Sequence, residues 1–321
     1  MERILDPAID PAPLAGKRVA IVGYGNQGRA QALNLRDSGI DVVVGLREGS
    51  PSFARAVDDG LAAASRRVAV DGADAVFLLL PDEAMSAAYG AIEPYLRRGA
   101  TLGFAHGLAI RFGLVAPRAD LDVIMVAPKG PGTALRSLYL DGKGMLALFA
   151  VAQDASGGAR DTALAYGRAL GCGRAGMVET SFAEECEADL FNEQAVVWGA
   201  VPDLLIAGFD TLVEGGVAPE IAYMECVGEL KLLAELVEAR GIAGMREAIS
   251  NTAELGAVLG GPKIVDESVR QRMRDILAEV RSGRFAAELE AEKADDYPLL
   301  RRARARARSL GVEAARVSIG D

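Results

Sequence analysis

Histidine, tryptophan and cysteine are all scarce in this chain. Its 321 residues include one histidine, one tryptophan and three cysteines. The cysteines, Cys172, Cys186 and Cys226, are odd in number and lack the spacing of a zinc site, so we expect a reduced, cytoplasmic protein. No histidine base stands near any of them in the sequence, which argues against a catalytic cysteine.

Positive charge is also in deficit, with 35 Lys and Arg residues against 45 Asp and Glu residues. The formal net charge of −10 argues against nucleic acid or an anionic membrane surface as a partner. Residues 1–13 lack the basic start and apolar run of a signal peptide. No apolar run reaches the length of about 18 residues that a membrane-spanning helix needs, so we predict no such helix.

The first half of the chain alternates short apolar runs with helical stretches such as 27–38 and 83–97. The runs are 18–23, 41–46, 74–81, 100–107, 123–130 and 145–152. They alternate poorly between apolar and polar residues, as strands buried on both faces do. We predict a Rossmann-like, doubly wound parallel sheet within residues 1–180, with residues 1–15 as a tether.

The second half has a helical spacing of apolar residues, which predicts an all-α domain over residues 181–321. Helices are expected at about 184–199, 202–215, 219–240, 242–258 and 266–293. Glycine breaks are expected at Gly215–Gly216, Gly241 and Gly260–Pro262. The basic tail, 301–317, is interpreted as a solvated helix or a frayed end.

A glycine-rich segment follows the first predicted strand directly and opens a helical stretch. It reads Gly23, Tyr24, Gly25, Asn26, Gln27 and Gly28. In a dinucleotide-binding turn one glycine makes the bend, one lets the backbone approach the pyrophosphate, and one lets helix and strand pack closely. This position between strand and helix predicts a dinucleotide cofactor rather than a structural turn.

The end of the second strand bears on the choice of dinucleotide. Arg47, Ser50 and Ser52 offer one cation and two hydroxyls, which suit the 2′-phosphate of NADPH. Glu48 could instead hold the ribose hydroxyls of NADH, and the serines could simply cap the next helix. We favour NADPH.

Two residues at later strand ends are candidates for the reacting edge of the sheet. His106 follows the predicted strand at 100–107 and Lys129 the one at 123–130. Ligands of such sheets bind beyond the carboxyl ends of the strands. A lone histidine is often structural and a lysine is usually exposed, but their shared position favours a role at the site.

Two pairs of carboxylates in the second half are each spaced one helical turn apart. Asp189 and Glu193 form one pair, and Glu225 and Glu229 form the other. Apolar neighbours suggest that these acids are partly buried. Facing pairs of this kind could chelate Mg²⁺, which prefers oxygen ligands. Ser250, in a polar run, could cap a helix or bind a substrate carboxylate.

The segments GYGNQG, GLREGSPS, LLLPDE, FAHG, VIMVAPKGPG, DLFNEQAV, ECVGELKL and SNTAE resemble, in order and spacing, the short class I ketol-acid reductoisomerases. The resemblance runs from about residue 14 to 293. It implies an NADPH-dependent enzyme with two Mg²⁺ ions. Such an enzyme converts a 2-hydroxy-2-alkyl-3-oxo acid such as acetolactate to a 2,3-dihydroxy acid in branched-chain amino-acid biosynthesis. An alkyl group migrates first and hydride reduction follows.

The resemblance also implies roles for particular residues. Asp189 would bridge both metal ions, Glu193 would bind one and relay protons, and a partner subunit's Glu225 and Glu229 would complete the cage of a homodimer. Ser250 would hold the substrate carboxylate, and His106 and Lys129 would help proton movement. Further cofactor contacts are implied at Asp82 and Gly132. The family's helical domain is knotted.

The chain departs from the family pattern at Arg29, Gln31, Asn192, Gly228 and Leu255. Trp198, one turn after Glu193 on the predicted helix, could line the pocket for the migrating alkyl group or point into the helical core. A paralogue acting on another ketol acid is one alternative. A metal-independent 2-hydroxy-acid or imine reductase and a catalytically silent NADP-binding sensor are others.

Overall fold

The computed structural model describes residues 1–320. They form two compact units, 1–186 and 187–320, and each is described by itself. The boundary falls inside one helix, α8 (Phe182–Ala195), which begins in the first unit and continues into the second.

A nine-stranded sheet forms the centre of the first unit, in the order β1-β9-β8-β7-β6-β5-β2-β3-β4. The strands from β4 to β7 are parallel, which confirms the Rossmann-like fold. The strands are β1 (Arg3–Ile4), β2 (Arg18–Val22), β3 (Asp41–Leu46), β4 (Ala62–Ser65), β5 (Ala75–Leu78), β6 (Thr101–Phe104), β7 (Asp122–Pro128), β8 (Ala147–Gln153) and β9 (Met177–Glu179).

The prediction of an all-parallel sheet is wrong for β8, which runs antiparallel to β7. Ala147 at the start of β8 pairs with Pro128 at the end of β7. The chain therefore re-enters the sheet at the edge where it left, whereas a parallel crossover would have to return to the opposite edge.

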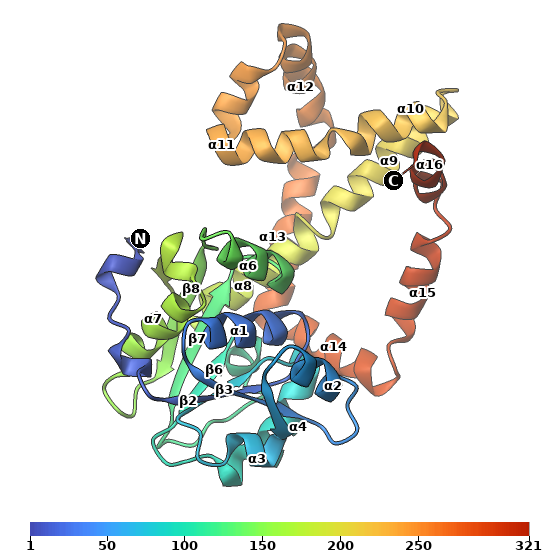
Figure 1. Ribbon diagram of the computed structural model, residues 1–321. Helices are drawn as coiled ribbons and strands as arrows, with labels where there is room; N and C mark the ends of the chain where they lie inside the picture. Colours follow the sequence, from blue (N-terminus) through green and yellow to red (C-terminus); the bar gives the residue numbers. More distant parts are fainter. Residues whose placement is uncertain (321) are drawn as a thin grey trace. The chain divides into compact units, whose positions relative to one another are not determined.

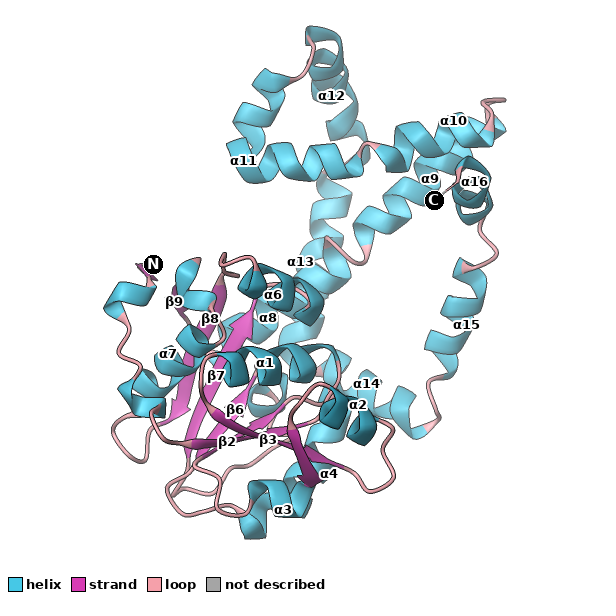
Figure 2. Ribbon diagram, in the orientation of Figure 1, coloured by secondary structure: helices cyan, strands magenta, loops and turns pink. Residues whose placement is uncertain are grey.

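Helices cover both faces of this sheet (Figure 2). They are α1 (Asn26–Asp37), α2 (Ser52–Asp58), α3 (Arg66–Val70), α4 (Asp82–Ile92), α5 (Leu108–Arg111), α6 (Gly132–Leu140) and α7 (Ala159–Ala169), with 3₁₀ turns at Asp6–Ala8, Ala12–Leu14, Glu93–Tyr95 and Cys172–Arg174. Along β2, Val19 and Ile21 belong to one core cluster, and Ala20 and Val22 belong to the other. Burial on both faces explains why the strand sequences are apolar throughout.

The expected tether at residues 1–15 is wrong. Strand β1 pairs antiparallel with β9, and Ile9 and Leu14 are each 2% exposed. The segment is thus part of the first unit (Figure 1). Strands β1, β4 and β9 were not predicted, because two to four residues are too few to show a period.

The second unit is helical, as predicted. It contains the rest of α8, then α9 (Ala200–Glu214), α10 (Pro219–Tyr223), the π-helical turn η5 (Met224–Gly228), α11 (Leu230–Ala248), α12 (Asn251–Ile264), α13 (Glu267–Ser282), α14 (Arg284–Ala294), α15 (Pro298–Ala307) and α16 (Gly311–Ile319). The predicted break at Gly241 is present, with φ of 67°. The one at Gly260–Pro262 is wrong, because Pro262 lies in the last turn of α12 and the helix continues through it.

The turn after α8 corrects the position of Trp198. Helix α8 ends at Ala195, so Val197 and Trp198 lie in the turn that follows rather than on the same helix as Glu193. The indole is 69% exposed, so it does not point into the core of the described chain.

The basic tail is not frayed. It ends in α16, whose Val312 and Ala315 are buried in a cluster with Phe209 and Ala222. The helix before it, α15, has no buried residue, as expected for a solvated helix.

Helices α11 and α12 have no fully buried residue, although both carry large apolar side chains that are exposed. The helical stretch Phe182–Glu214 is also apolar and long enough, by length and composition alone, to cross a membrane. That is weak evidence, because the turn at 196–199 divides it into α8 and α9. Each piece spans only about 22 Å, less than the hydrocarbon core of about 30 Å.

Candidate active site

The carboxyl ends of the parallel strands bring the predicted residues of the first unit to one edge of the sheet. The glycine-rich segment follows β2, Arg47 follows β3, and Asp82 opens α4 after β5. His106 follows β6 and Lys129 follows β7. A cavity of about 340 Å³ runs from Tyr24 and the following residues, past Asp82, to His106. It joins the predicted cofactor turn to the predicted reacting end.

The glycines of the turn have different surroundings. Gly23 has φ of 110°, and a Cβ there would overlap the carbonyl oxygen of Leu79. A Cβ at Gly28 would overlap the carbonyl oxygen of Gly23, whereas one at Gly25 would meet nothing within 4 Å. The turn therefore needs glycine at its first and last positions and leaves the backbone open at the middle one, where a pyrophosphate would approach.

The connection between β7 and α6 forms hydrogen bonds with the glycine-rich turn. Gln27 Nε2 donates to the carbonyl oxygen of Gly130 (2.9 Å), and the backbone N–H of Thr133 donates to Asn26 Oδ1 (3.2 Å). A Cβ at Gly132 would overlap the backbone of Asn26. Gly132 is therefore needed for close packing against the turn.

A carboxylate that the sequence did not single out also fixes the turn. Asp59, just after α2, accepts from Tyr24 Oη and from Arg29 Nε and Nη2, each at 2.7 Å. The Arg29 hydrogen bond, opposed by burial, lowers the pKa of Asp59 to about 2. No local motif marks Asp59, because its partners lie about thirty residues away.

We expect Asp59→Asn to lower the free energy of unfolding by about 1–2 kcal/mol at pH 7, since it weakens charge-assisted bonds to Arg29 and Tyr24. The pKa of an unfolded Asp is about 3.9, so this stabilisation is complete above that pH and is lost as the pH falls through about 2. Urea unfolding at several pH values checks it. A gap between the two proteins that stays constant down to pH 2 would contradict it.

The two serines that follow β3 form a hydrogen bond with each other. Ser50 Oγ accepts from the backbone N–H of Ser52 (3.3 Å), the first residue of α2. The N-cap residue of that helix is Pro51, so neither serine occupies the capping position. Arg47 and Glu48 are exposed. The structure thus leaves both charged side chains accessible to a ligand at this strand end.

A buried carboxylate lies next to both His106 and Lys129, the two residues predicted at the reacting end. Glu185 is 2% exposed and accepts from the backbone N–H of Gly107 (2.8 Å). Its oxygens lie 3.0 Å from His106 Nδ1 and 3.7 Å from Lys129 Nζ. Burial alone would lower the pKa of His106, but the Cys186 thiol and the Glu185 carboxylate outweigh it and raise that pKa to about 11. The imidazole is therefore cationic at neutral pH.

Sequence reasoning missed Glu185, although a signal was present. Glu185, Asp189 and Glu193 are successively four residues apart on α8, so they share one face of that helix. The sequence prediction covers only the last two as a pair. Gly107 allows the approach of α8, because a Cβ there would overlap the carbonyl oxygen of Phe182.

The second carboxylate pair differs from its prediction. Glu225 lies in the π-helical turn η5 and Glu229 follows it, so ordinary helical spacing does not apply to them. Both are exposed, as is Glu193, and Asp189 is half-buried. Partial burial was therefore correct only for Asp189, because apolar neighbours on these helices are themselves exposed.

Ser250 caps a helix in the described chain. Its Oγ accepts from the backbone N–H of Ala253 (3.2 Å) at the start of α12. A substrate contact from this residue stays a prediction.

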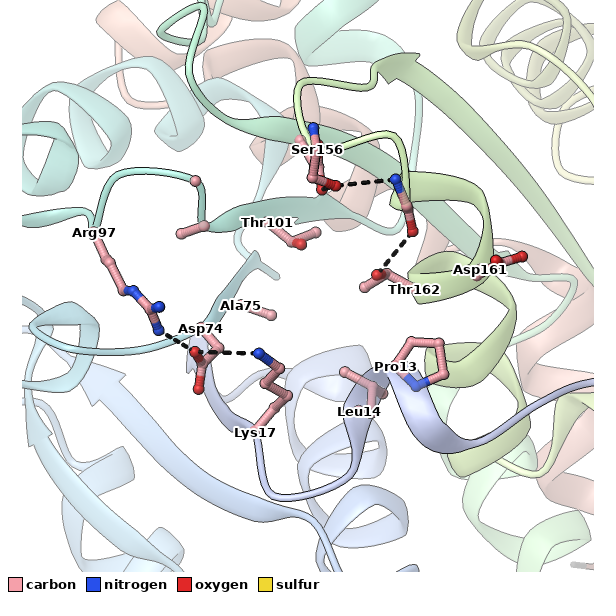
Figure 3. Close-up of a pocket in the computed structure, with 14 residues that line it drawn as sticks. Pro13, Leu14, Lys17, Asp74, Ala75, Arg97, Thr101, Ser156, Asp161 and Thr162 are labelled. Carbon is pink, nitrogen blue, oxygen red and sulfur yellow. Dashed lines mark hydrogen bonds and ion pairs between the residues drawn. The ribbon is translucent and has the colours of Figure 1, made fainter.

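A second cavity, of about 310 Å³, opens at the opposite, amino-terminal edge of the sheet (Figure 3). Asp74 pairs there with Arg97 and with Lys17 (3.8 Å). Its charged side chains largely neutralise one another, and none of the predicted site residues lines it. The candidate active site therefore stays at the carboxyl edge.

Two family models match the chain. Residues 13–176 match the NADPH-binding domain of acetohydroxy acid isomeroreductase, and residues 182–318 match the C-terminal domain of ketol-acid reductoisomerase.

Solved structures agree with these matches. An NADH-preferring ketol-acid reductoisomerase from an uncultured archean is 43% identical, with a TM-score of 0.96 over 99% of this chain and 98% of that chain. A semialdehyde dehydrogenase NAD-binding protein from Cupriavidus necator is 20% identical, with a TM-score of 0.63 over 83% of this chain and 99% of that one. A pyrroline carboxylate reductase from Plasmodium falciparum is 13% identical, with a TM-score of 0.55 over 83% of this chain and 98% of that one. The last two share the fold alone.

Proposed function

Because the chain belongs to the ketol-acid reductoisomerase family, we propose that it converts acetolactate or a related 2-hydroxy-2-alkyl-3-oxo acid to a 2,3-dihydroxy acid. We propose NADPH and two Mg²⁺ ions as its cofactors, branched-chain amino-acid biosynthesis as its pathway and the cytoplasm as its location. One observation carries the proposal. The cavity that starts at the glycine-rich turn ends at His106, which Glu185 joins to Lys129.

His106, Lys129 and Glu185 form a charged group in the first unit that is suited to proton transfer beside an anionic substrate. His106 presents a cation at the end of the cavity, and the buried carboxylate of Glu185 contacts both His106 and Lys129. A positioned imidazole or ammonium group can donate a proton to an oxygen on which negative charge develops. The bond from Gly107 to Glu185 fixes the carboxylate, so the cations need little reorganisation.

The donor chemistry of the predicted ligands fits magnesium. Asp189 and Glu193 share a face of α8, and all four predicted ligands are carboxylates, as a hard cation requires. We propose that Glu225 and Glu229 join them from a second subunit. When bound, the ions would supply Lewis acidity toward the substrate oxygens.

We propose NADPH rather than NADH as the hydride donor, although the archaeal relative prefers NADH. The support is the exposed cation and the two hydroxyls that follow β3, namely Arg47, Ser50 and Ser52. Such a group suits a 2′-phosphate better than ribose hydroxyls. Glu48 is the competing feature, and relative affinity for the two cofactors decides between them.

We propose a homodimer as the active form. Helices α11 and α12 expose large apolar side chains that a second copy of the chain would cover: Leu232, Leu233, Ile242, Leu255, Val258, Leu259 and Ile264. A shared site would explain why Glu225 and Glu229 are exposed in one copy. The family's knotted topology is proposed for this unit as well.

The decisive experiment follows NADPH oxidation with acetolactate, 2-aceto-2-hydroxybutyrate and 3-hydroxypyruvate, with Mg²⁺ and after EDTA treatment. We expect turnover of both ketol acids that falls to background without Mg²⁺ and returns when it is added back. Chelator-insensitive reduction of 3-hydroxypyruvate alone would instead indicate a simple 2-oxo-acid reductase. NADPH binding without turnover of any of the three would indicate a silent sensor.

A further inference from the structure

Two arginines leave the sheet side by side at its carboxyl edge. Strands β3 and β4 are parallel, and Leu46 pairs with Ser65 at their ends. The next residues along the two strands are Arg47 and Arg66. A Cβ at Gly45, near the end of β3, would lie only 3.4 Å from the Cα of Arg66, so the two strand ends are in close contact.

These two cations lack the partners that several other arginines of this unit have. Arg29 and Arg36 pair with carboxylates, and Arg67 lies 4.7 Å from the centre of the Tyr95 ring. Within residues 1–320, neither Arg47 nor Arg66 forms an ion pair, and the exposed carboxylate of Glu48 joins neither.

The guanidinium of Arg66 is also partly withdrawn from water. Its Nε is buried and makes no hydrogen bond to any part of the described chain. Burial, with a further contribution from Arg47, lowers the pKa of Arg66. A buried donor without an acceptor is costly, so this arrangement favours an anion that accepts from Nε.

The position of Arg47 and Arg66 in the sheet indicates which anion they would bind. In a dinucleotide-binding sheet, the end of the second parallel strand faces the 2′ position of the adenosine ribose. Here that strand is β3, and β4 is its neighbour at the edge of the sheet. A 2′-phosphate at this position carries a charge of about −1.5 to −2 and three acceptor oxygens, which two guanidinium groups can share.

We propose that Arg66 is a second 2′-phosphate-binding residue, which acts with Arg47 to select NADP(H) over NAD(H). This inference rests on the proposed use of NADPH and adds a residue that no sequence motif marks. The preference for NADP(H) then depends on residues at the ends of both β3 and β4, not on the loop after β3 alone.

The test measures equilibrium binding of NADPH and NADH by cofactor fluorescence, and of 2′,5′-ADP and 5′-AMP by calorimetry. Arg66→Met keeps an unbranched apolar stem of similar length to the arginine methylenes and removes the guanidinium. We expect it to weaken NADPH and 2′,5′-ADP binding by about 10- to 100-fold and to leave NADH and 5′-AMP within about twofold. Arg66→Lys, which keeps the charge but not the fork, should fall between the two.

Arg67→Met is the matched control, because Arg67 is the adjacent residue and stacks on Tyr95. We expect it to leave all four ligands within about twofold of wild type. Thermal unfolding of Arg66→Met should occur no earlier than that of wild type, because the variant removes an unpaired and desolvated charge.

Two results would overturn the role of Arg66. One is an unchanged NADPH affinity in Arg66→Met, and the other is an equal loss for NADPH and NADH, which would place the guanidinium on the adenine or ribose. A wild-type protein that binds NADH as tightly as NADPH would overturn both this role and the proposed cofactor preference. The acetolactate assay with Mg²⁺ tests the reaction separately.

Discussion

Glu185→Gln is expected to lower kcat with acetolactate by about 10²- to 10³-fold, while the Kd for NADPH stays within about twofold. The carboxylate is buried against His106 and Lys129 and does not line the cavity beside the cofactor turn. Glutamine can still accept from the backbone N–H of Gly107, but it removes the negative charge that His106 and Lys129 share. The loss should therefore be electrostatic rather than structural.

His106 reports that change directly, because it is the only histidine in the chain. Its ¹⁵N resonances need no assignment. In the wild type the pKa of His106 is raised to about 11, so the imidazole stays cationic between pH 6 and about 9. In Glu185→Gln the hydrogen bond with Cys186 remains, but the negative charge of Glu185 is lost while burial still opposes the cation, so the pKa of His106 should fall.

The free energy of unfolding should also depend on the protonation of His106. A folded-state pKa above the unfolded value means that the His106–Glu185 pair contributes fully below about pH 6.5. Its contribution declines as the pH rises and is lost near pH 11. Glu184→Gln is the matched control, since within residues 1–320 that exposed carboxylate accepts a hydrogen bond only from Thr180 Oγ1 (2.7 Å). A pKa of His106 that is unchanged in Glu185→Gln, with normal kcat, would disprove the role of Glu185.

Glu193→Gln is expected to abolish isomerisation of acetolactate, with a fall in kcat of at least about 10³-fold and an unchanged NADPH affinity. The amide is a weak ligand for a hard cation and cannot carry a proton. Glu193 is exposed on α8, so its replacement should change the free energy of unfolding by no more than about 0.5 kcal/mol.

Comparison of substrates separates the two halves of the reaction. We expect Glu193→Gln to lower kcat far more with acetolactate than with 3-hydroxypyruvate, because reduction of 3-hydroxypyruvate needs no alkyl migration. Glu184→Gln again serves as the control from the same helix. Wild-type turnover of acetolactate by Glu193→Gln at saturating Mg²⁺ would refute the assignment.

Much of the first unit could be read from sequence because its signals are local. Strands buried on both faces are apolar along their whole length, as the alternation of Val19, Ala20, Ile21 and Val22 between two core clusters shows. The glycine turn was recognisable because its requirements for positive φ and close packing fall within six consecutive residues. Where the pattern was short or the helix irregular, as at β4 and η5, the prediction failed.

The missed residues of the site have a common physical origin. Asp59 and Glu185 act through residues far away in the chain, namely Tyr24 and His106, and the role proposed for Arg66 depends on Arg47, which folding brings close to it. Burial was misjudged for the same reason. Whether an apolar stretch is covered depends on what packs against it, and on α11 and α12 nothing within the described chain does so completely.

The alternation of the longer strands and helices, the glycine-rich turn and the resemblance to the family were thus determined by sequence alone, since short-range sterics and periodic burial specify them. Tertiary structure decided which charges meet. It placed a buried carboxylate behind the single histidine, an aspartate on the cofactor turn and an unpaired arginine beside Arg47. Electrostatic interactions act through space between residues that only folding brings together, so no local pattern could show them.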